Sequence, residues 1–324
     1  MSPHGPTQRG HPPLGPTQAG PTQTGPTQTG QTQTIRAQTG PTLTVIVPVY
    51  RQWDRVPVLL HHLVAQTLGA DLWHLVLVAN DDPPRTLMLA PNMRLIACPT
   101  PGAYSARNAG LAQASGDWLV FTDADCLPPP DWLANHHGAL PDHPALQAGP
   151  VRMRAPEAGR AAQFWSSFDL LRGIPQARYV REGFAATANL AIHRAVFDSV
   201  GPFDPARLSG GDAAFCRAAT NAGFALTLAN AAVTHHPCRT TWADLSRKAR
   251  RVKAGQVLHG TPRARALALL RTLLPPLRQL MRFGKNPAPL GRRVQACAVL
   301  MALWGAELVE LVNLLILRRP PERR

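Results

Sequence analysis

Short apolar runs rich in β-branched residues recur along the first part of the chain, separated by segments with an amphipathic helical pattern. Runs of this kind predict buried strands. They lie at 43–50, at 73–79, near 93–97 and at 118–125, where the last strand runs into a turn. Helices are predicted after Pro57 and over 103–114. This alternation predicts an α/β fold, in which helices cover both faces of a mostly parallel, Rossmann-like sheet.

Composition divides the chain into three parts. Residues 1–40 repeat the motif G-P-T-Q four times and hold almost no large apolar side chains, so we predict a disordered tail. Residues 41–242 carry the strand and helix pattern and are predicted to form the catalytic domain. Residues 243–324 are predicted to form a basic helical region that is associated with a membrane.

The net charge of +15 is not spread evenly. Residues 1–238 hold 16 Lys and Arg against 15 Asp and Glu, whereas residues 239–324 hold 18 against 4. A basic region of this kind suits lipid headgroups or nucleic acid. Few aromatic residues lie among the charges, which makes nucleic acid the less favoured partner. The five cysteines are scattered, as in proteins of a reducing compartment, and the N-terminus shows no secretory signal.

Two Leu-rich helical stretches follow residue 240, over 263–283 and 292–317. Pro275-Pro276 must break or kink the first of them. Three arginines share one face of that first stretch: Arg271, Arg278 and Arg282. Basic, Leu-rich helices of this type lie in the membrane interface.

The segment 294–317 is long enough to span a bilayer, but its acids Glu307 and Glu310 would be costly there. We therefore favour a peripheral, in-plane or re-entrant helix at the cytoplasmic face of a membrane. A full span remains open, and so does packing of both stretches on the catalytic domain or in a dimer.

The sharpest chemical signal is Asp123-Ala124-Asp125, directly after an apolar strand. Ligands bind at the carboxyl ends of strands in open α/β sheets. Residues two apart in extended backbone point to one side, so both carboxylates can face the same ligand. A hard divalent cation that also bridges a diphosphate, Mg²⁺ or Mn²⁺, would relieve their repulsion.

Two further candidates lie toward the end of the predicted domain. Asp212 follows Gly210-Gly211 at the start of a helix predicted over 212–222. It is either a plain N-cap or a base that takes a proton from an incoming hydroxyl. His235-His236 either completes a metal shell or lies in a surface loop.

Taken in order, these segments resemble the family 2 glycosyltransferases of the GT-A fold over about residues 43–242. The family's G-x-x-x-A-R-N-x-G element is matched from Gly102 to Gly110, and its G-E-D helix start is matched from Gly210. The chain departs from this last element, because Gly211 stands where Glu is common.

The resemblance implies a role for each matched residue. Pro48 and Tyr50 would frame the nucleotide, and Asp81, in the ambiguous run Asn80 to Asp82, would meet the base. The remaining implied roles are donor binding for Arg107, Asn108 and Asp123, metal binding for Asp125 and His235 or His236, acceptor contact for Asn189 and Gly211, and base catalysis for Asp212.

The implied reaction is inverting transfer of one sugar from a nucleotide-sugar to an acceptor hydroxyl, with a lipid-linked or cell-envelope glycan as acceptor. Two alternatives remain. A sugar-phosphate nucleotidyltransferase should carry a Gly-rich phosphate loop after its first strand, which V-P-V-Y-R-Q-W is not. The other is a basic protein without catalysis that binds nucleic acid or a membrane.

Overall fold

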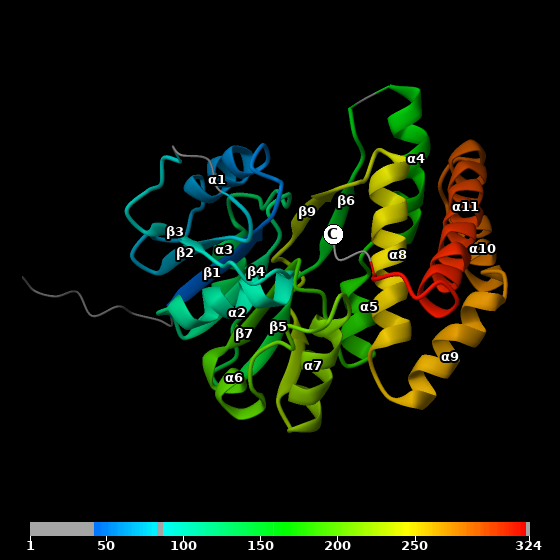
Figure 1. Cartoon of the computed structure of the whole chain (residues 1–324). Helices are drawn as coiled ribbons and strands as arrows, with labels where there is room; N and C mark the ends of the chain where they lie inside the picture. The colour runs from blue at the N-terminus through cyan, green and yellow to red at the C-terminus, as the bar shows by residue number, and fades with distance from the viewer. Residues whose placement is uncertain (1–41, 83–86, 158, 322–324) are drawn as a thin grey trace, which may run out of the picture. The chain divides into compact units, whose positions relative to one another are not determined.

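The computed structural model describes residues 42–82, 87–157 and 159–321 (Figure 1). The tail predicted over residues 1–40 lies outside these described residues. Seven strands form the central sheet in the order β3-β2-β1-β4-β7-β5-β8. Their bounds are Leu43–Val49 (β1), Trp73–Ala79 (β2), Met93–Ala97 (β3), Trp118–Thr122 (β4), Ala145–Ala148 (β5), Asn189–His193 (β7) and Ala225–Leu228 (β8).

Strand directions agree with the predicted mostly parallel sheet. β1 pairs in parallel with both β2 and β4, and β2 with β3. β7 alone runs antiparallel to its two neighbours, β4 and β5. The four apolar runs of the sequence correspond to β1 to β4, and Asp123 and Asp125 lie just beyond the last of them, in the turn.

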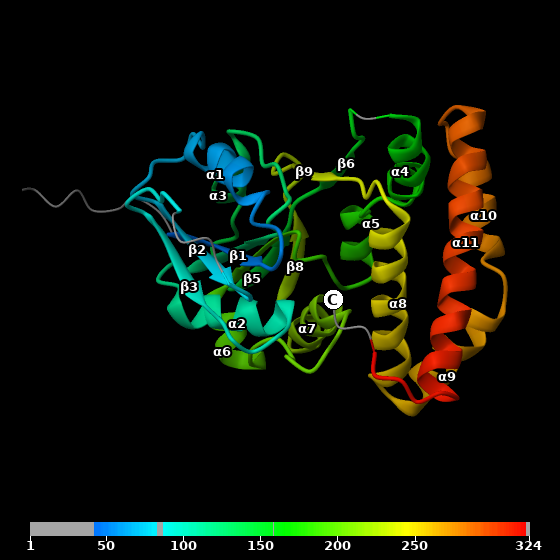
Figure 2. The same ribbon diagram turned by 45° about the horizontal axis from the view of Figure 1, so that its top comes forward.

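The period of two along each strand builds two apolar layers. Leu43, Val45 and Val47 of β1 are fully buried in one layer, together with α1 (Val56–Val64) and α3 (Trp132–His137). Ile46 joins the other layer. That layer also receives the buried faces of α2 (Ala103–Gln113), α6 (Arg194–Val200) and α7 (Gly211–Asn221), and the two views show helices on both sides of the sheet (Figures 1 and 2).

A second sheet of two parallel strands stands beside the first. It consists of β6 (Val151–Arg154) and β9 (Thr234–Pro237). Leu127 lies two residues after Asp125 and makes an isolated bridge to His235 of β9. The bridge brings β9 beside the turn that follows β4.

The helices of the C-terminal region pack on the catalytic body rather than apart from it. They are α8 (Trp242–Leu258), α9 (Pro262–Leu273), α10 (Leu277–Gly284) and α11 (Leu290–Leu315), and they lie beside α4 (Arg160–Arg172) and the short α5 (Gln176–Arg181). α11 runs along both α4 and α8 (Figures 1 and 2). Pro275-Pro276 separates α9 from α10, as predicted.

One face of α11 is core and the other is exposed. Leu300 and Leu303 are buried against Phe168 of α4 and Leu245 of α8. α11 has the length and apolar composition to cross a membrane, yet only 28% of its most apolar stretch is buried in the protein. The inner face of α11 therefore packs on the rest of the protein, which is one of the alternatives given above for this segment. This packing does not account for the exposed apolar residues of its outer face.

Candidate active site

A cavity of about 1280 Å³ opens at the carboxyl ends of β1 and β4. Its walls come from the loops after these strands, from the starts of α2 and α7, from β9 and from one side of α8. Pockets for one small ligand are typically about 300–1000 Å³. This cavity therefore has room for two substrates.

Three potential metal ligands meet in this cavity. Ligand atoms of Asp123, Asp125 and His236 all lie within 4.8 Å of one another. His236 Nδ1 is 2.8 Å from the carbonyl oxygen of Pro237, which can only accept, so Nδ1 carries the proton. The other ring nitrogen, Nε2, faces the carboxylates and lies 3.6 Å from Asp125 Oδ1.

This arrangement fits a hard divalent cation, because it offers carboxylate oxygens and one imidazole nitrogen. It also distinguishes the roles of the two adjacent histidines. His236 reaches the cluster, whereas His235 is placed by its backbone bridge to Leu127 and contributes no atom to it.

Arg107 holds the first carboxylate of the motif. Its Nη2 donates to Asp123 Oδ1 at 2.8 Å, and only 6% of its side chain is exposed. Its guanidinium also lies over the ring of Tyr104, 5.7 Å from the centroid. Asp123 is thereby fixed and partly neutralised beside Asp125.

Asp212 lines the same cavity and is not an N-cap. Gly210, in the left-handed conformation with φ +70°, occupies the cap position, and Asp212 is in the first turn of α7. Its Oδ1 accepts from the Tyr104 hydroxyl at 3.4 Å and from Ala213 N at 2.9 Å. Its Oδ2 lies 3.5 Å from Thr187 N. The carboxylate is therefore oriented by groups from three parts of the chain.

Tyr104 explains the unusual glycine before the acid. Its hydroxyl accepts from Gly211 N at 2.8 Å, and burial, followed by the charge of Asp212, raises its pKa. A Cβ at position 211 would lie 2.6 Å from the Tyr104 ring. The ring thus fills the space that a Glu side chain would need. Gly211 is buried and is not among the residues that line the cavity, and its expected acceptor contact stays a prediction.

Asn108 is engaged within the fold. Its amide donates to Phe203 O at 2.7 Å and accepts from Phe203 N at 3.0 Å. Both ends of the side chain are occupied by one backbone unit, and Asn108 is not among the residues that line the cavity. It fixes the segment that leads to α7, and its expected contact with the sugar donor stays a prediction.

Asn189, the residue expected at the acceptor, is also engaged within the fold. The side chain is fully buried at the start of β7. Its oxygen accepts from Trp132 Nε1 and lies 2.8 Å from His136 Nε2, and its nitrogen donates to the carbonyls of Pro150 and Ala232. All its hydrogen-bonding capacity is used inside the fold, so Asn189 joins the sheet to α3 and to the loops around it.

Pro48 and Tyr50, the two residues expected to frame a nucleotide, line the cavity. Asp81 accepts from Arg51 N at 2.7 Å and from Trp53 Nε1 at 3.0 Å, and Arg51 has the strained φ of +53°. Asp81 thus holds the loop after Tyr50 in its unusual conformation, and its neighbour Asn80 lines the cavity.

One wall of the cavity is cationic and was not predicted from the sequence. Arg247, Lys248 and Arg251 of α8 line the cavity, although their charges were attributed to the membrane-associated region. Burial, with a contribution from Arg239, lowers the pKa of Lys248 to about 7. The signal was present in the run R-K-A-R-R at 247–251, whose first, second and fifth residues share one helical face.

Comparison with known proteins identifies the family. Residues 44–201 match the family described as Glycosyl transferase family 2. The chain is 31% identical over 226 residues to Glycosyltransferase AglE of Haloferax volcanii, covering 67% of this chain and 73% of that protein. The chain belongs to glycosyltransferase family 2.

Two other similarities agree with this membership. The chain is 29% identical over 154 residues to Pre-mycofactocin glycosyltransferase of Mycobacterium tuberculosis, covering 46% of this chain and 33% of that relative's length. A mannosyltransferase, PcManGT from Pyrobaculum calidifontis in complex with GDP-Man and Mn²⁺, superimposes with a TM-score of 0.53 at 19% identity, over 86% of this chain and 88% of that one. This family 2 glycosyltransferase has the predicted GT-A fold, and neither alternative activity is favoured.

Proposed function

We propose that the protein transfers one sugar, with inversion, from a nucleotide-sugar to a hydroxyl of a lipid-linked or cell-envelope acceptor, assisted by Mn²⁺ or Mg²⁺. The observation that carries the proposal is the meeting of Asp123, Asp125 and His236 in one cavity with Asp212. Together they supply a place for the diphosphate and a carboxylate base for the acceptor.

On the donor side, Tyr50 and Pro48 frame the nucleotide at the end of β1. Asp81 acts through the loop that it holds and stays our candidate for base recognition. Asp123, kept in place by Arg107, meets the ribose. A divalent cation on Asp125 and His236 would neutralise the charge that develops on the leaving diphosphate.

On the acceptor side, Asp212 accepts the proton of the attacking hydroxyl. The acceptor oxygen forms the new bond at the anomeric carbon while the bond to the diphosphate breaks on the opposite face, which inverts the configuration. Tyr104 remains protonated at neutral pH and donates to Oδ1 of Asp212, which orients the carboxylate in the cavity wall.

The proposed setting is the cytoplasmic face of a membrane, where the C-terminal helices bind an anionic lipid surface. Large apolar side chains remain exposed on consecutive helices, among them Leu270, Leu273, Leu274, Leu277 and Met281, each about 60% exposed. Arg271, Arg278 and Arg282 of the same helices are exposed as well. An apolar face bordered by cations supports an interfacial position of these helices.

Calorimetric titration tests the metal and donor parts of the proposal. We would titrate GDP, UDP and dTDP with and without Mn²⁺, and GDP-Man first among the sugar donors, since the mannosyltransferase of similar fold was solved with it. Asp125→Ala should abolish transfer and the Mn²⁺-dependent part of the nucleotide affinity. His236→Ala should weaken it, and His235→Ala, the matched control, should not. Unchanged Mn²⁺-dependent affinity in Asp125→Ala would refute the metal assignment.

A further inference from the structure

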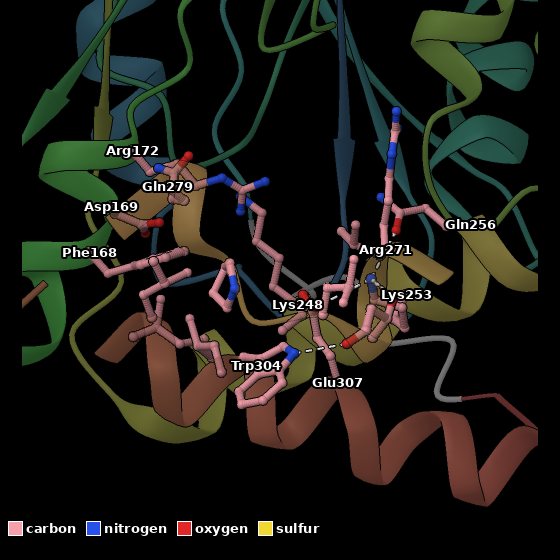
Figure 3. A pocket seen from close by; sticks show the side chains of 18 residues that line it. Phe168, Asp169, Arg172, Lys248, Lys253, Gln256, Arg271, Gln279, Trp304 and Glu307 are labelled. Atoms are coloured by element: carbon pink, nitrogen blue, oxygen red, sulfur yellow. Dashed lines mark hydrogen bonds and ion pairs between the residues drawn. The ribbon is translucent and has the colours of Figure 1, made fainter. Parts of the chain in front are cut away.

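A second chamber of about 220 Å³ lies between α4, α8, α9, α10 and α11 (Figure 3). Much of its wall is apolar and comes from Phe168, Leu245, Val252, Leu300 and Leu303, with Trp304 along α11. A cavity of roughly 150 Å³ already accommodates a benzene molecule. This chamber therefore suits a short apolar segment of a larger ligand.

The chamber connects two regions described above. Asp169, Arg172, Lys248 and Val252 line both the chamber and the catalytic cavity, so the two meet at these side chains. The chamber is also lined by Leu274, which is 61% exposed at the break between α9 and α10. An apolar path thus leads from the exposed leucines to the edge of the catalytic cavity.

The charges at the junction are not balanced. Asp169 is the acid at the junction, and it is already paired with Arg239. The guanidinium and the backbone nitrogen of Arg239 donate to Asp169 Oδ2 at 3.1 and 3.0 Å. Within the described parts of the chain, neither Arg172 nor Lys248 has a carboxylate within ion-pair distance. Arg251 Nε is buried there without a hydrogen-bond partner. The junction therefore attracts an anion.

At the opposite end of the chamber, a cation is paired with an acid of the protein. Lys253 contacts Glu307 at 3.0 Å and the hydroxyl of Thr272 at 2.7 Å. In Figure 3, Asp169 and Arg172 lie at one end of the chamber and Lys253 and Arg271 at the other. Lys253 at the far end is paired with a carboxylate, whereas no carboxylate among the described residues pairs with Lys248 or with Arg172, whose guanidinium lies over the Phe168 ring.

We propose that the chamber binds the first apolar segment of a phosphorylated lipid acceptor, whose phosphate contacts Arg172 and Lys248 at the junction. The sugar attached to this phosphate would extend into the catalytic cavity, where its hydroxyl meets Asp212. The size of that cavity, which exceeds one small ligand, leaves room for this sugar beside the nucleotide-sugar. The identity of the ligand as an acceptor rests on the proposed function.

The test measures binding of decyl phosphate, below its micelle concentration, to the full-length protein by calorimetry. Decanol has the alkyl chain without the phosphate, and inorganic phosphate has the charge without the alkyl chain. Each should bind at least about 10-fold more weakly than decyl phosphate. Lys248→Met, which removes the charge, and Leu300→Trp, which fills the chamber, should each weaken decyl phosphate binding by about 10-fold or more. Arg278→Met, on the exposed side of α10, is the matched control and should bind as the wild type does.

Two outcomes would overturn the inference. One is wild-type affinity for decyl phosphate in Lys248→Met, a variant that retains the apolar wall, whatever Leu300→Trp does to folding. The other is displacement of decyl phosphate by GDP or UDP with Mn²⁺, which would assign the cations to the sugar donor. Mn²⁺-dependent nucleotide binding, measured in parallel, reports separately on the proposed function.

Discussion

At the scale of single residues, Asp212 and Tyr104 form the most specific arrangement in the cavity. The carboxylate receives the tyrosine hydroxyl and two backbone nitrogens, so its orientation is set before a substrate arrives. An Asn side chain could accept from the same tyrosine and from Ala213 N, but it could not take up a proton. The two roles of Asp212, positioning and base catalysis, can therefore be separated.

We predict that Asp212→Asn folds and binds nucleotide normally but lowers kcat by roughly 10²–10⁴-fold, the usual contribution of a positioned base. Initial rates of sugar transfer at saturating sugar donor measure the effect. Asp204→Asn, on the exposed loop before α7, is the control and should retain its rate. Near-normal turnover of Asp212→Asn would mean that this residue only orients its neighbours.

The buried side chain of Asn189 contributes to the stability of the fold. Substitution by Ala leaves the buried groups of Trp132 and His136 and two carbonyls without their partner. We predict a loss of about 3 kcal/mol or more in the free energy of unfolding, measured in urea. Asn221→Ala, exposed at the end of α7, should change it by less than about 0.5 kcal/mol. A stable Asn189→Ala protein with defective acceptor binding would restore the role expected from the sequence.

At the scale of elements, α8 joins the catalytic cavity to the C-terminal helices. Lys248 is surrounded by Asp169 and Arg172 of α4 and by Arg239 and Arg251. Its lowered pKa means that the unfolded chain binds a proton that the folded protein releases, between about pH 7 and 10.5. Stability due to this group must therefore rise with pH across that window.

We predict that Lys248→Met raises the melting temperature at pH 7 and that this advantage shrinks toward pH 9. Scanning calorimetry of both proteins at several pH values measures the difference, in which the titration of the cysteines cancels. A difference that does not vary with pH would show that Lys248 is charged or uncharged throughout this range. Lys248 in this account lowers stability in exchange for a binding site, as functional residues often do.

The elements also show where sequence patterns suffice. Strands β1 to β4 and helix α2 were predicted because each apolar run is continuous and its end is marked by polar residues. Strands β5 to β8 were not, because runs such as A-L-Q-A at 145–148 and V-R-M-R at 151–154 are too short to show a period. The helix α8 was missed because its basic residues were grouped with those that follow.

Some residues of the candidate site could be placed from the sequence, and others could not. Asp123 and Asp125 stand next to a strand, so their position follows from local order. The pairing of Asn108 with Phe203 and of Asn189 with α3 spans 95 and 53–57 residues. Such contacts depend on the order of strands in the sheet, which no local pattern contains.

At the scale of the whole molecule, the exposed apolar face of α9 and α10 predicts binding to anionic membranes. Burying two leucines contributes about 3 kcal/mol or more, which corresponds to roughly 100-fold in partitioning. Leu273→Glu combined with Leu277→Glu should therefore weaken sedimentation with anionic vesicles by about that factor. Val58→Glu with Val64→Glu, exposed on α1, is the matched control and should have no effect.

Salt distinguishes the two contributions to this binding. Release by high salt alone would show that the arginines dominate, and release only by detergent would show that the leucines are inserted. Wild-type protein that ignores anionic vesicles at low salt would contradict the membrane setting, and the exposed face would then need a protein partner.

The contact between Tyr104 and Gly211 has a consequence for how such enzymes diverge. A side chain at 211 cannot be accommodated while the ring is present, and loss of the ring would leave the Asp212 carboxylate without a hydroxyl donor. The two positions are therefore expected to change together. In an alignment of relatives, Glu at the position of Gly211 should accompany a smaller residue at the position of Tyr104, and independent variation of the two columns would show that the backbone adjusts instead.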